Sequence, residues 1–283
     1  MSRKRGKRGI ARPRAEDFAP IAPEEEARLR AEAEAYAASN AEYESFAEAD
    51  EDSAPLGPPP TLEDALFALE SWQDAGKAAE MAAYHKAVRR YLGVSTPAID
   101  DMVTLWRAQL DVPARVDLAR GLWDSDIHEA RIAAAKLLVQ ARLRPDQAAW
   151  DLIASWVEQL DAWAIADTVC KAGEKRVVAD PTRLDQVETW TQSDQMWTRR
   201  AAFVITLPWT KQRNPKPDDL AIRERVLGWA EALAEDRDWF IQKVIAWWLR
   251  ELSKKDPERV QAWLETSGEK LKKFARKEAA KYL

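Results

Sequence analysis

The sequence predicts an all-α fold: an α-solenoid of HEAT-like helical repeats, preceded by a disordered N-terminal tail. Apolar residues are spaced as on helices almost everywhere after Thr61. Only 9 of the 283 residues are glycine while 14 are tryptophan, a composition that suits long helices packed through aromatic surfaces. Similar helix starts also recur along the chain, as they do in repeat proteins. We expect no strands.

The chain divides into a tail, residues 1–58, and a repeat domain, residues 59–283. Residues 3–14 carry seven basic side chains and no acidic one, residues 16–52 are dominated by Ala and Glu, and the tail ends in a proline-rich segment. Such a composition buries too little apolar surface to fold. The basic block is either a solubilising extension or a phosphate-binding arm with the acidic block as its intramolecular competitor.

The repeat domain is predicted to consist of helices joined by short connections, as in stacked antiparallel hairpins. Thr61 is a plausible N-cap, and Glu63 and Asp64 follow in the first turn, where acidic side chains favour the helix dipole. The predicted ranges are 61–73, 76–92, 97–109, 112–123, 126–142, 146–158, 162–173, 183–192, 194–206, 218–234, 238–253, 256–266 and 271–281. The second of these is expected to stop at Gly93.

Weak self-similarity supports a repeat. The segment that starts at Ser125 resembles the one that starts at Ser193, and the segment at Asp236 resembles both. With Asp161 as the intervening start, the spacings are 36, 32 and 43 residues, within or just below the range of HEAT or armadillo repeats. A solenoid of this kind exposes a long concave surface that suits a polymer.

Composition excludes several classes of function. Cys170 is the only cysteine, and His85 and His128 are the only histidines, so we expect no disulfide, no metal site and no cofactor. No apolar run approaches the roughly 20 residues of a membrane span, and no signal segment follows Met1, so a cytoplasmic location is expected. We also expect a monomer. The net charge of −5 lies mostly in the tail. A near-neutral domain is compatible with DNA binding, because local stripes of Lys and Arg decide it.

Trp163 and Asp167 form the most informative pair. Four residues apart on one predicted helix, they share a face and place an indole beside a carboxylate. From the spacing alone, a packing tryptophan and a solvated aspartate are the more common explanation, so the pair by itself is weak evidence for a site.

A second constellation surrounds two adjacent tryptophans. Trp247 and Arg250 share one helix face, and Lys243 lies one turn earlier. Trp248 and Leu252 share another face and are predicted to point inward, because adjacent residues of a helix cannot both be buried on the same side.

Two further segments carry basic residues. Arg199 and Arg200 stand near the start of an apolar helix, where a solvated face is an equal alternative to phosphate binding. Aromatic and basic residues interleave around Tyr84, Lys86 and Arg89, and His85 is expected to be a surface or phosphate-contacting residue rather than a catalytic base. The candidate DNA-binding residues are Tyr84, Lys86, Arg89, Arg199, Arg200, Lys243 and Arg250.

Together these segments resemble the AlkD-type DNA alkylation repair family, alkylpurine DNA glycosylases built from HEAT-like repeats. The likeness covers roughly residues 70–283. The chain departs from the family pattern at Ala162, where the family often has a second aromatic residue, and in its long tail. The resemblance rests on Tyr84 with the Leu-Gly-Val-x-Thr-Pro run, Leu122-Trp123, Trp163 with Asp167, Trp197-x-Arg199-Arg200, the segment from Phe240 to Glu251, and Lys277-Glu278-Ala279.

The resemblance implies that Asp167, Trp163 and Trp247 form the catalytic cleft, with Tyr84 nearby, and that Arg200 and Arg250 hold the phosphate backbone. The implied substrate is double-stranded DNA containing purines alkylated at N3 or N7. Asp167 would face the oxocarbenium-like sugar or position water, and the indoles would contact the lesion nucleotide. Whether the damaged base leaves the stack is left open. The alternative function is a non-catalytic solenoid that binds DNA or a protein; it predicts that these tryptophans are buried between helices.

Overall fold

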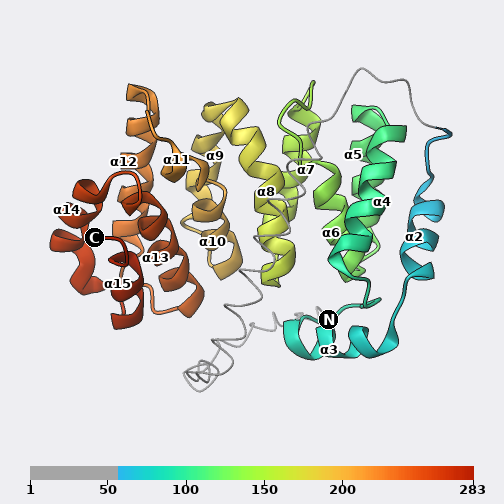
Figure 1. Ribbon diagram of the computed structural model, residues 1–283, viewed down its shortest axis with the longest axis horizontal. Helices are drawn as coiled ribbons and strands as arrows, with labels where there is room; N and C mark the ends of the chain where they lie inside the picture. Colours follow the sequence, from blue (N-terminus) through green and yellow to red (C-terminus); the bar gives the residue numbers. More distant parts are fainter. Residues whose placement is uncertain (1–56) are drawn as a thin grey trace, which may run out of the picture. The chain divides into compact units, whose positions relative to one another are not determined.

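The computed structural model describes residues 57–283. Within this part the chain forms helices and one isolated parallel bridge between Arg90 and Ile127, with no strand. The helices follow one another along a stack from α2 to α15 (Figure 1). The predicted all-α solenoid is therefore confirmed for the described residues. The predicted tail lies outside them apart from Gly57 and Pro58.

The α-helices are α2 (Leu62–Ser71), α3 (Ala75–His85), α4 (Thr96–Gln109), α5 (Val112–Asp124), α6 (His128–Leu137), α7 (Gln147–Val157), α8 (Trp163–Ala179), α9 (Leu184–Trp190), α10 (Met196–Val204), α11 (Pro208–Lys211), α12 (Pro217–Ala232), α13 (Trp239–Ser253), α14 (Pro257–Ser267) and α15 (Lys273–Ala279). Two short 3₁₀ helices, η2 (Pro181–Arg183) and η3 (Gly268–Lys270), join their neighbours. Each predicted range overlaps one α-helix, and α11 is the helix that the pattern missed.

Local chemistry explains the start of the stack. The Thr61 hydroxyl accepts a hydrogen bond from the backbone N–H of Asp64 at 3.1 Å, and the Asp64 carboxylate accepts one from the Thr61 N–H at 2.9 Å. This reciprocal capping box satisfies two backbone donors at the helix start. The predicted N-cap is confirmed.

Helix α3 ends earlier than the sequence predicted. The helix stops at His85 rather than at 92, because Lys86 takes a left-handed conformation with φ 59° and caps it. The remaining residues up to Gly93 form no helix and bend at 88–89, and the backbone N–H of His128 donates to the carbonyl of Arg90 at 2.9 Å. Gly93 therefore has a different role from the predicted helix stop.

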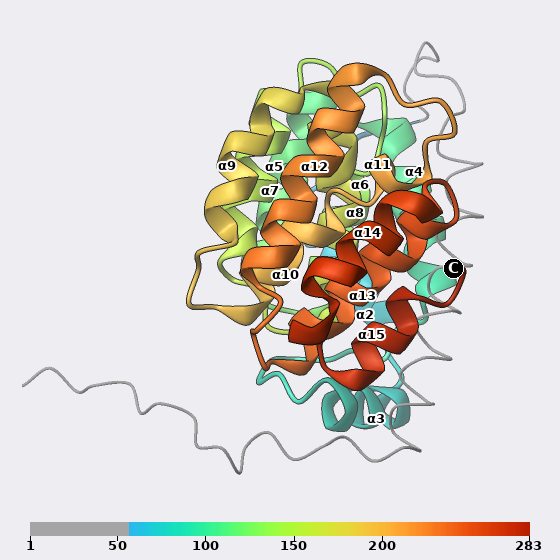
Figure 2. The same ribbon diagram turned by 90° about the vertical axis from the view of Figure 1, so that its left-hand side faces the viewer.

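Glu129 and Gly93 fasten this segment. The wholly buried Glu129 carboxylate accepts hydrogen bonds from the N–H groups of Leu92 and Gly93 at 2.9 and 2.7 Å. The Asp74 N–H, at the start of α3, donates to the Leu92 carbonyl at 2.8 Å. Since α3 has no buried residue of its own, these bonds carry much of its attachment. In two views at right angles α3 lies across the lower end of the stack (Figures 1 and 2).

The helical repeat is visible in the hydrogen bonds of three tryptophan side chains. The indole N–H groups of Trp123, Trp150 and Trp263 donate to acceptors 36 residues away along the chain, at 2.9, 2.9 and 3.1 Å. One acceptor per repeat satisfies each indole donor, as a buried polar group requires. Five helices, which we call the central row, pack each against the next: α6, α8, α10, α13 and α15.

Candidate active site

The partly exposed stripe of α8 holds Trp163 and Asp167. Both side chains are half-buried, whereas the residues between them, Ala164 to Ala166, are buried. Helix α8 packs against α6, α7 and α10, so the stripe faces the side that these neighbours leave open. The structure thus places an indole beside a carboxylate on one helix face.

Asp167 is joined to the next helix of the central row. Its carboxylate accepts a hydrogen bond from the Arg200 guanidinium, and the two groups form an ion pair. The Arg200 side chain is 9% exposed and that of Asp167 is 17% exposed. Burial by itself lowers the pKa of Arg200, but the charge and hydrogen bond of Asp167 outweigh it, and the pKa lies above its ordinary value. Arg200 therefore stays cationic.

Helix α13 contributes the second indole. Trp247 is half-buried and packs against the core, while Trp248 and Leu252 are wholly buried. The prediction that the two adjacent tryptophans are not both buried, and that Trp248 points inward, is confirmed. Trp247 lies on a partly exposed stripe together with Phe240, Lys243 and Arg250.

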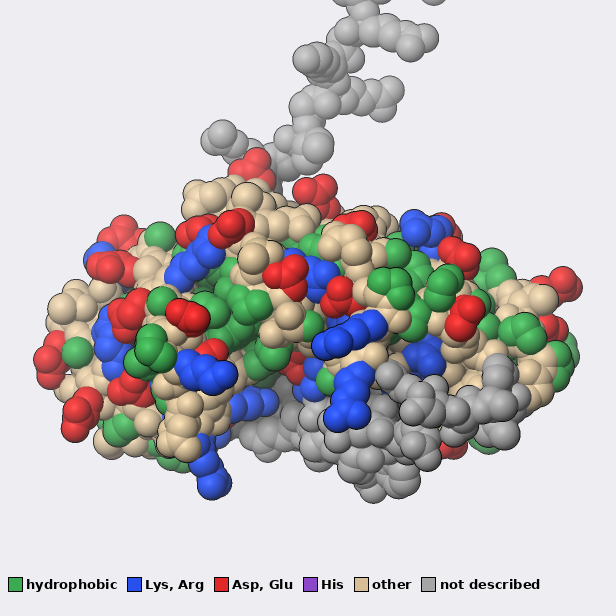
Figure 3. All heavy atoms as spheres, turned by 90° about the horizontal axis from the view of Figure 1, so that it is seen from above, with side chains coloured by type: hydrophobic (Ala, Val, Ile, Leu, Met, Phe, Trp, Pro, Cys, Tyr) green, Lys and Arg blue, Asp and Glu red, His purple; other side chains and the backbone are tan. Residues whose placement is uncertain are grey.

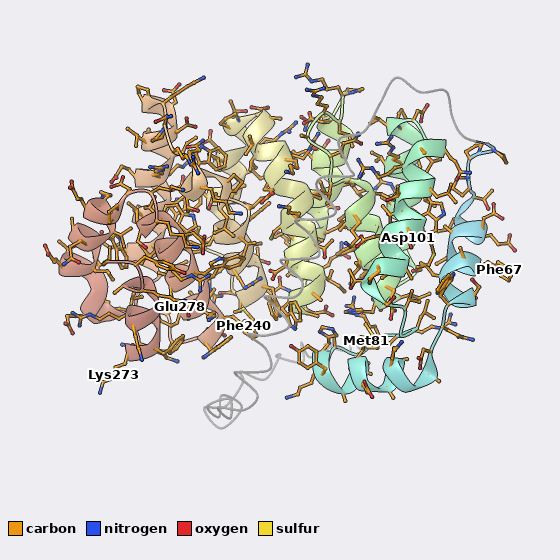
Figure 4. The ribbon with its side chains drawn as sticks, viewed as in Figure 1. Phe67, Met81, Asp101, Phe240, Lys273 and Glu278 are labelled. Atoms are coloured by element: carbon orange, nitrogen blue, oxygen red, sulfur yellow. The ribbon has the colours of Figure 1, made fainter. Side chains whose placement is uncertain are left out.

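Glu278 binds both cations of this stripe, and Arg250 also pairs with Glu251 at 3.2 Å. Glu278 of α15 accepts a hydrogen bond from the Lys243 ammonium at 2.7 Å and from the Arg250 guanidinium at 2.6 Å. Figure 4 shows Phe240 at the start of α13 and Glu278 on the neighbouring α15. The two cations are thereby held together beside one carboxylate.

Helix α10 links the two stripes. The Trp197 ring lies 4.7 Å from the Phe240 ring of α13, and the Arg200 guanidinium lies 5.7 Å from the centre of the Trp197 ring. The contacts connect Asp167 through α10 to the helix that carries Trp247. Along these helices Trp163, Asp167 and Trp247 keep part of their side chains exposed, and Arg200 lies buried against Asp167.

Tyr84 reaches the site from α3. Its ring meets that of Trp163 edge to face, with the centroids 6.1 Å apart. His85 also touches Trp163, at 5.6 Å. The His85 side chain is half-buried among aromatic rings rather than fully exposed, and its contact with phosphate stays a prediction.

The other predicted cations have different surroundings. Lys86 is exposed at the end of α3. Arg89 has a side chain only 3% exposed and pairs with Asp161 and Asp126, and Arg199 pairs with Asp236 at 3.0 Å. These ion pairs hold the segments that precede α6, α8 and α13. A structural role therefore explains both arginines, and contact with DNA is not needed to explain them.

The model of the family described as DNA alkylation repair enzyme matches residues 65–283. The chain belongs to this family. No curated protein matches the sequence significantly.

Two solved structures share the fold of this DNA alkylation repair family member. One is described as a predicted DNA alkylation repair enzyme from Enterococcus faecalis, with 21% identity and a TM-score of 0.62, covering 75% of this chain and 96% of the other. The second is AlkD2 from Streptococcus mutans, with 19% identity and a TM-score of 0.52, covering 74% and 98%. At such identity the likeness establishes the fold alone.

Sequence reasoning missed several neighbours of the site in this family member. His128, Tyr91 and Glu278 all contact predicted site residues or their supports. For His128 a signal existed: it stands two residues after Asp126, as Trp163 stands two residues after Asp161. Aligned helix starts place both rings at the same end of the central row.

Other surfaces of the described part are less distinctive. Seen from above, the edge away from α3 carries acidic and basic side chains intermixed (Figure 3). No three His, Cys, Asp or Glu side chains within residues 57–283 gather as a metal site. None of the helices between residues 57 and 283 is long and apolar enough to cross a membrane.

His128 makes stability depend on pH. Burial, then the proximity of His85 and Arg89, hold the pKa of His128 well below its ordinary 6.5. Below pH 6.5 the unfolded chain takes up a proton that the folded chain refuses, so the free energy of unfolding falls with falling pH, by up to about 1.4 kcal/mol per unit. Urea unfolding at pH 7.5, 6.5 and 5.5 measures this. A free energy of unfolding that does not fall below pH 6.5 in wild type, or falls as much in His128→Phe, contradicts it.

Proposed function

We propose that this protein is a DNA glycosylase that excises cationic N3- or N7-alkylated purines from double-stranded DNA, as the first step of base excision repair. The observation that carries the proposal is the half-buried Asp167 carboxylate, beside Trp163 and paired with Arg200 on the open side of the central row. We further propose that the protein acts as a monomer in the cytoplasm and needs no cofactor.

The chemistry asks little of the enzyme. An alkylated purine carries a positive charge, so the bond between C1′ and the base nitrogen breaks with its electron pair going to the base, which leaves neutral. The sugar then develops positive charge. Asp167 stabilises that charge or orients the water whose oxygen bonds to C1′. Water supplies the oxygen and loses one proton to solvent.

The tryptophans and cations complete the proposed cleft. Trp163 and Trp247 can add cation–π attraction of about 0.5 to 2 kcal/mol each to a cationic nucleotide. Lys243 and Arg250 would meet a phosphate, which replaces the Glu278 carboxylate at both cations while Arg250 keeps its pair with Glu251. Lys86 and Arg200 remain proposed backbone contacts, and Arg89 and Arg199 are the weaker candidates because ion pairs with acidic residues explain both.

The exposure of the indoles weighs against a purely structural solenoid. Such a protein would bury these tryptophans between helices, as it does Trp123, Trp156 and Trp248. Trp163 and Trp247 instead keep part of their surface open. A partly open indole beside a carboxylate suits a substrate better than a core.

Direct methyl transfer to a cysteine is the chemical alternative for a repair enzyme. Cys170 is 1% exposed, its thiol faces the Ala201 carbonyl, and burial raises the pKa of the thiol far above its ordinary value. The thiolate that such a transfer needs is therefore suppressed. Excision is the better supported reaction.

One experiment tests the proposal against both alternatives. Purified protein is incubated with duplexes that contain one 7-methylguanine or 3-methyladenine, and free bases and protein mass are measured together. We expect a free methylated base, unchanged protein mass, and full activity in Cys170→Ala. Protein that gains the mass of a methyl group indicates transfer. Duplex binding with neither product indicates a non-catalytic solenoid, and both outcomes reject the glycosylase.

A further inference from the structure

The only two histidines of the chain stack on one another beside Trp163. The His85 and His128 ring centroids are 4.5 Å apart with an angle of 30° between the rings, although 43 positions separate them in the sequence. His85 in turn lies 5.6 Å from Trp163 and 4.9 Å from Tyr84. Tyr91 closes the other side, 4.8 Å from His128. We call these five rings the histidine cluster.

His128 is the buried base of this cluster. Its side chain has no exposed surface, and within residues 57–283 neither of its ring nitrogens has a hydrogen-bond partner. A protonated imidazole would hold two donors without acceptors in an apolar environment. The geometry therefore requires a neutral ring at this position.

The charged side chains near the histidine cluster belong to the segment after α3, to the starts of α6 and α8, and to α6 itself. Arg89 follows α3 and has a side chain 3% exposed, and the His85 ring faces His128 directly. Two positive charges at stacking distance repel each other, so the pair accepts one proton at most. Among residues 57–283, the acidic groups beside the cluster already have other partners: Asp126 and Asp161 pair with Arg89, and Glu129 binds the backbone of Leu92 and Gly93.

The cluster connects α3 to the start of α8. Helix α3 has no buried residue, so its end is held over α8 by ring contacts and by the segment that Glu129 fastens. Trp163 is the first residue of α8 and receives both Tyr84 and His85 from α3. Any change in the stack is transmitted to the indole by direct contact.

We propose that His85 and His128, stacked and uncharged, are positioning residues that hold the Trp163 indole in place, and that one proton taken up by the pair releases it. The catalytic meaning of this inference rests on the proposed glycosylase function; the positioning of the indole does not. Excision would then be switched off in mild acid while the helical stack stays folded.

The first test reads the position of Trp163 without any activity. Protein labelled with 5-fluorotryptophan gives fluorine NMR signals, and the one lost in Trp163→Phe belongs to residue 163. Between pH 7.5 and 5.5 this signal should shift with the midpoint seen for the two histidines by proton NMR. In His85→Phe, which keeps a ring but cannot take up a proton, it should stay at its neutral position. A Trp163 signal that ignores the histidine titration overturns the proposal.

The second test reads catalysis. His85→Ala removes the ring support, and we expect single-turnover excision at pH 7.5 to slow about tenfold, with the duplex Kd changed less than about twofold. His85→Phe should restore the rate and extend activity to lower pH. Wild-type rates in His85→Ala, or the same acid loss in His85→Phe, reject the positioning role.

Two controls distinguish release of the indole from unfolding of the protein and from failure of the proposed glycosylase function. Far-ultraviolet circular dichroism at each pH shows that the helices are intact, so that unfolding is not mistaken for release of the indole. If the wild-type protein excises no base, the glycosylase proposal fails, yet the fluorine signal still decides the positioning. If excision occurs and the signal is insensitive to pH, the positioning fails alone.

Discussion

Replacement of Asp167 by Asn is expected to lower the single-turnover release of 7-methylguanine by about 100-fold or more. Asparagine keeps the shape of the side chain and an oxygen that accepts from Arg200, but it removes the negative charge that would face the developing sugar cation. The duplex Kd should change less than about threefold, because Asp167 contributes no attraction to phosphate. Quenched reactions under enzyme excess and fluorescence anisotropy measure the two quantities.

The chain offers a matched control for this variant. Asp236 also pairs with an arginine of α10, and the exposed fraction of its side chain, 18%, is close to the 17% of Asp167. Asp236→Asn should leave excision within about twofold of wild type, because Asp236 lies outside the proposed cleft. Equal losses in both variants would assign the effect to disrupted arginine pairs rather than to catalysis. An unchanged rate in Asp167→Asn removes the carboxylate from the mechanism.

Much of the fold could be predicted because helices leave local signals. The spacing of apolar residues located each of the predicted helices, and Thr61 with Asp64 announced the first. Likewise, the adjacent Trp247 and Trp248 could not both be buried on the same side of one helix. The end of α3 could not be predicted, since Lys86 has no sequence feature that favours a left-handed backbone; distant bonds from Glu129 hold the segment that follows.

The site divides in the same way. Trp163 and Asp167 share a helix face, so their proximity follows from a spacing of four residues. The partners of the cations could not be predicted from spacing, because they depend on how the repeats pack. Arg89 pairs with Asp161, 72 residues away, and Arg250 pairs with Glu278, 28 residues away. A basic residue in the sequence therefore indicates a possible phosphate contact, while its ion pairs in the fold decide whether it is open to DNA.

Gly93→Ala should detach α3 from the site and leave the rest of the stack folded. Gly93 has φ +78°, and an added Cβ would lie 2.2 Å from the Asp74 carbonyl oxygen and 2.6 Å from the Ala78 nitrogen. Both atoms belong to the backbone at the start of α3 and cannot swing aside. The left-handed conformation alone costs alanine about 1 to 2 kcal/mol. We expect faster hydrogen exchange in residues 75–93 and excision slowed about tenfold by the loss of Tyr84 and His85 from Trp163.

Gly228 is the matched control, because replacing it by alanine should stabilise the protein rather than destabilise it. It lies within α12, and an added Cβ would meet nothing within 4 Å. Alanine at this position should raise the free energy of unfolding by about 0.5 to 1 kcal/mol and leave excision unchanged. If Gly93→Ala leaves exchange in residues 75–93 at the wild-type rate, the close approach of Gly93 to α3 does not hold that helix. Faster exchange with full excision would instead show that α3 is attached as described but that the chemistry at Trp163 does not need it.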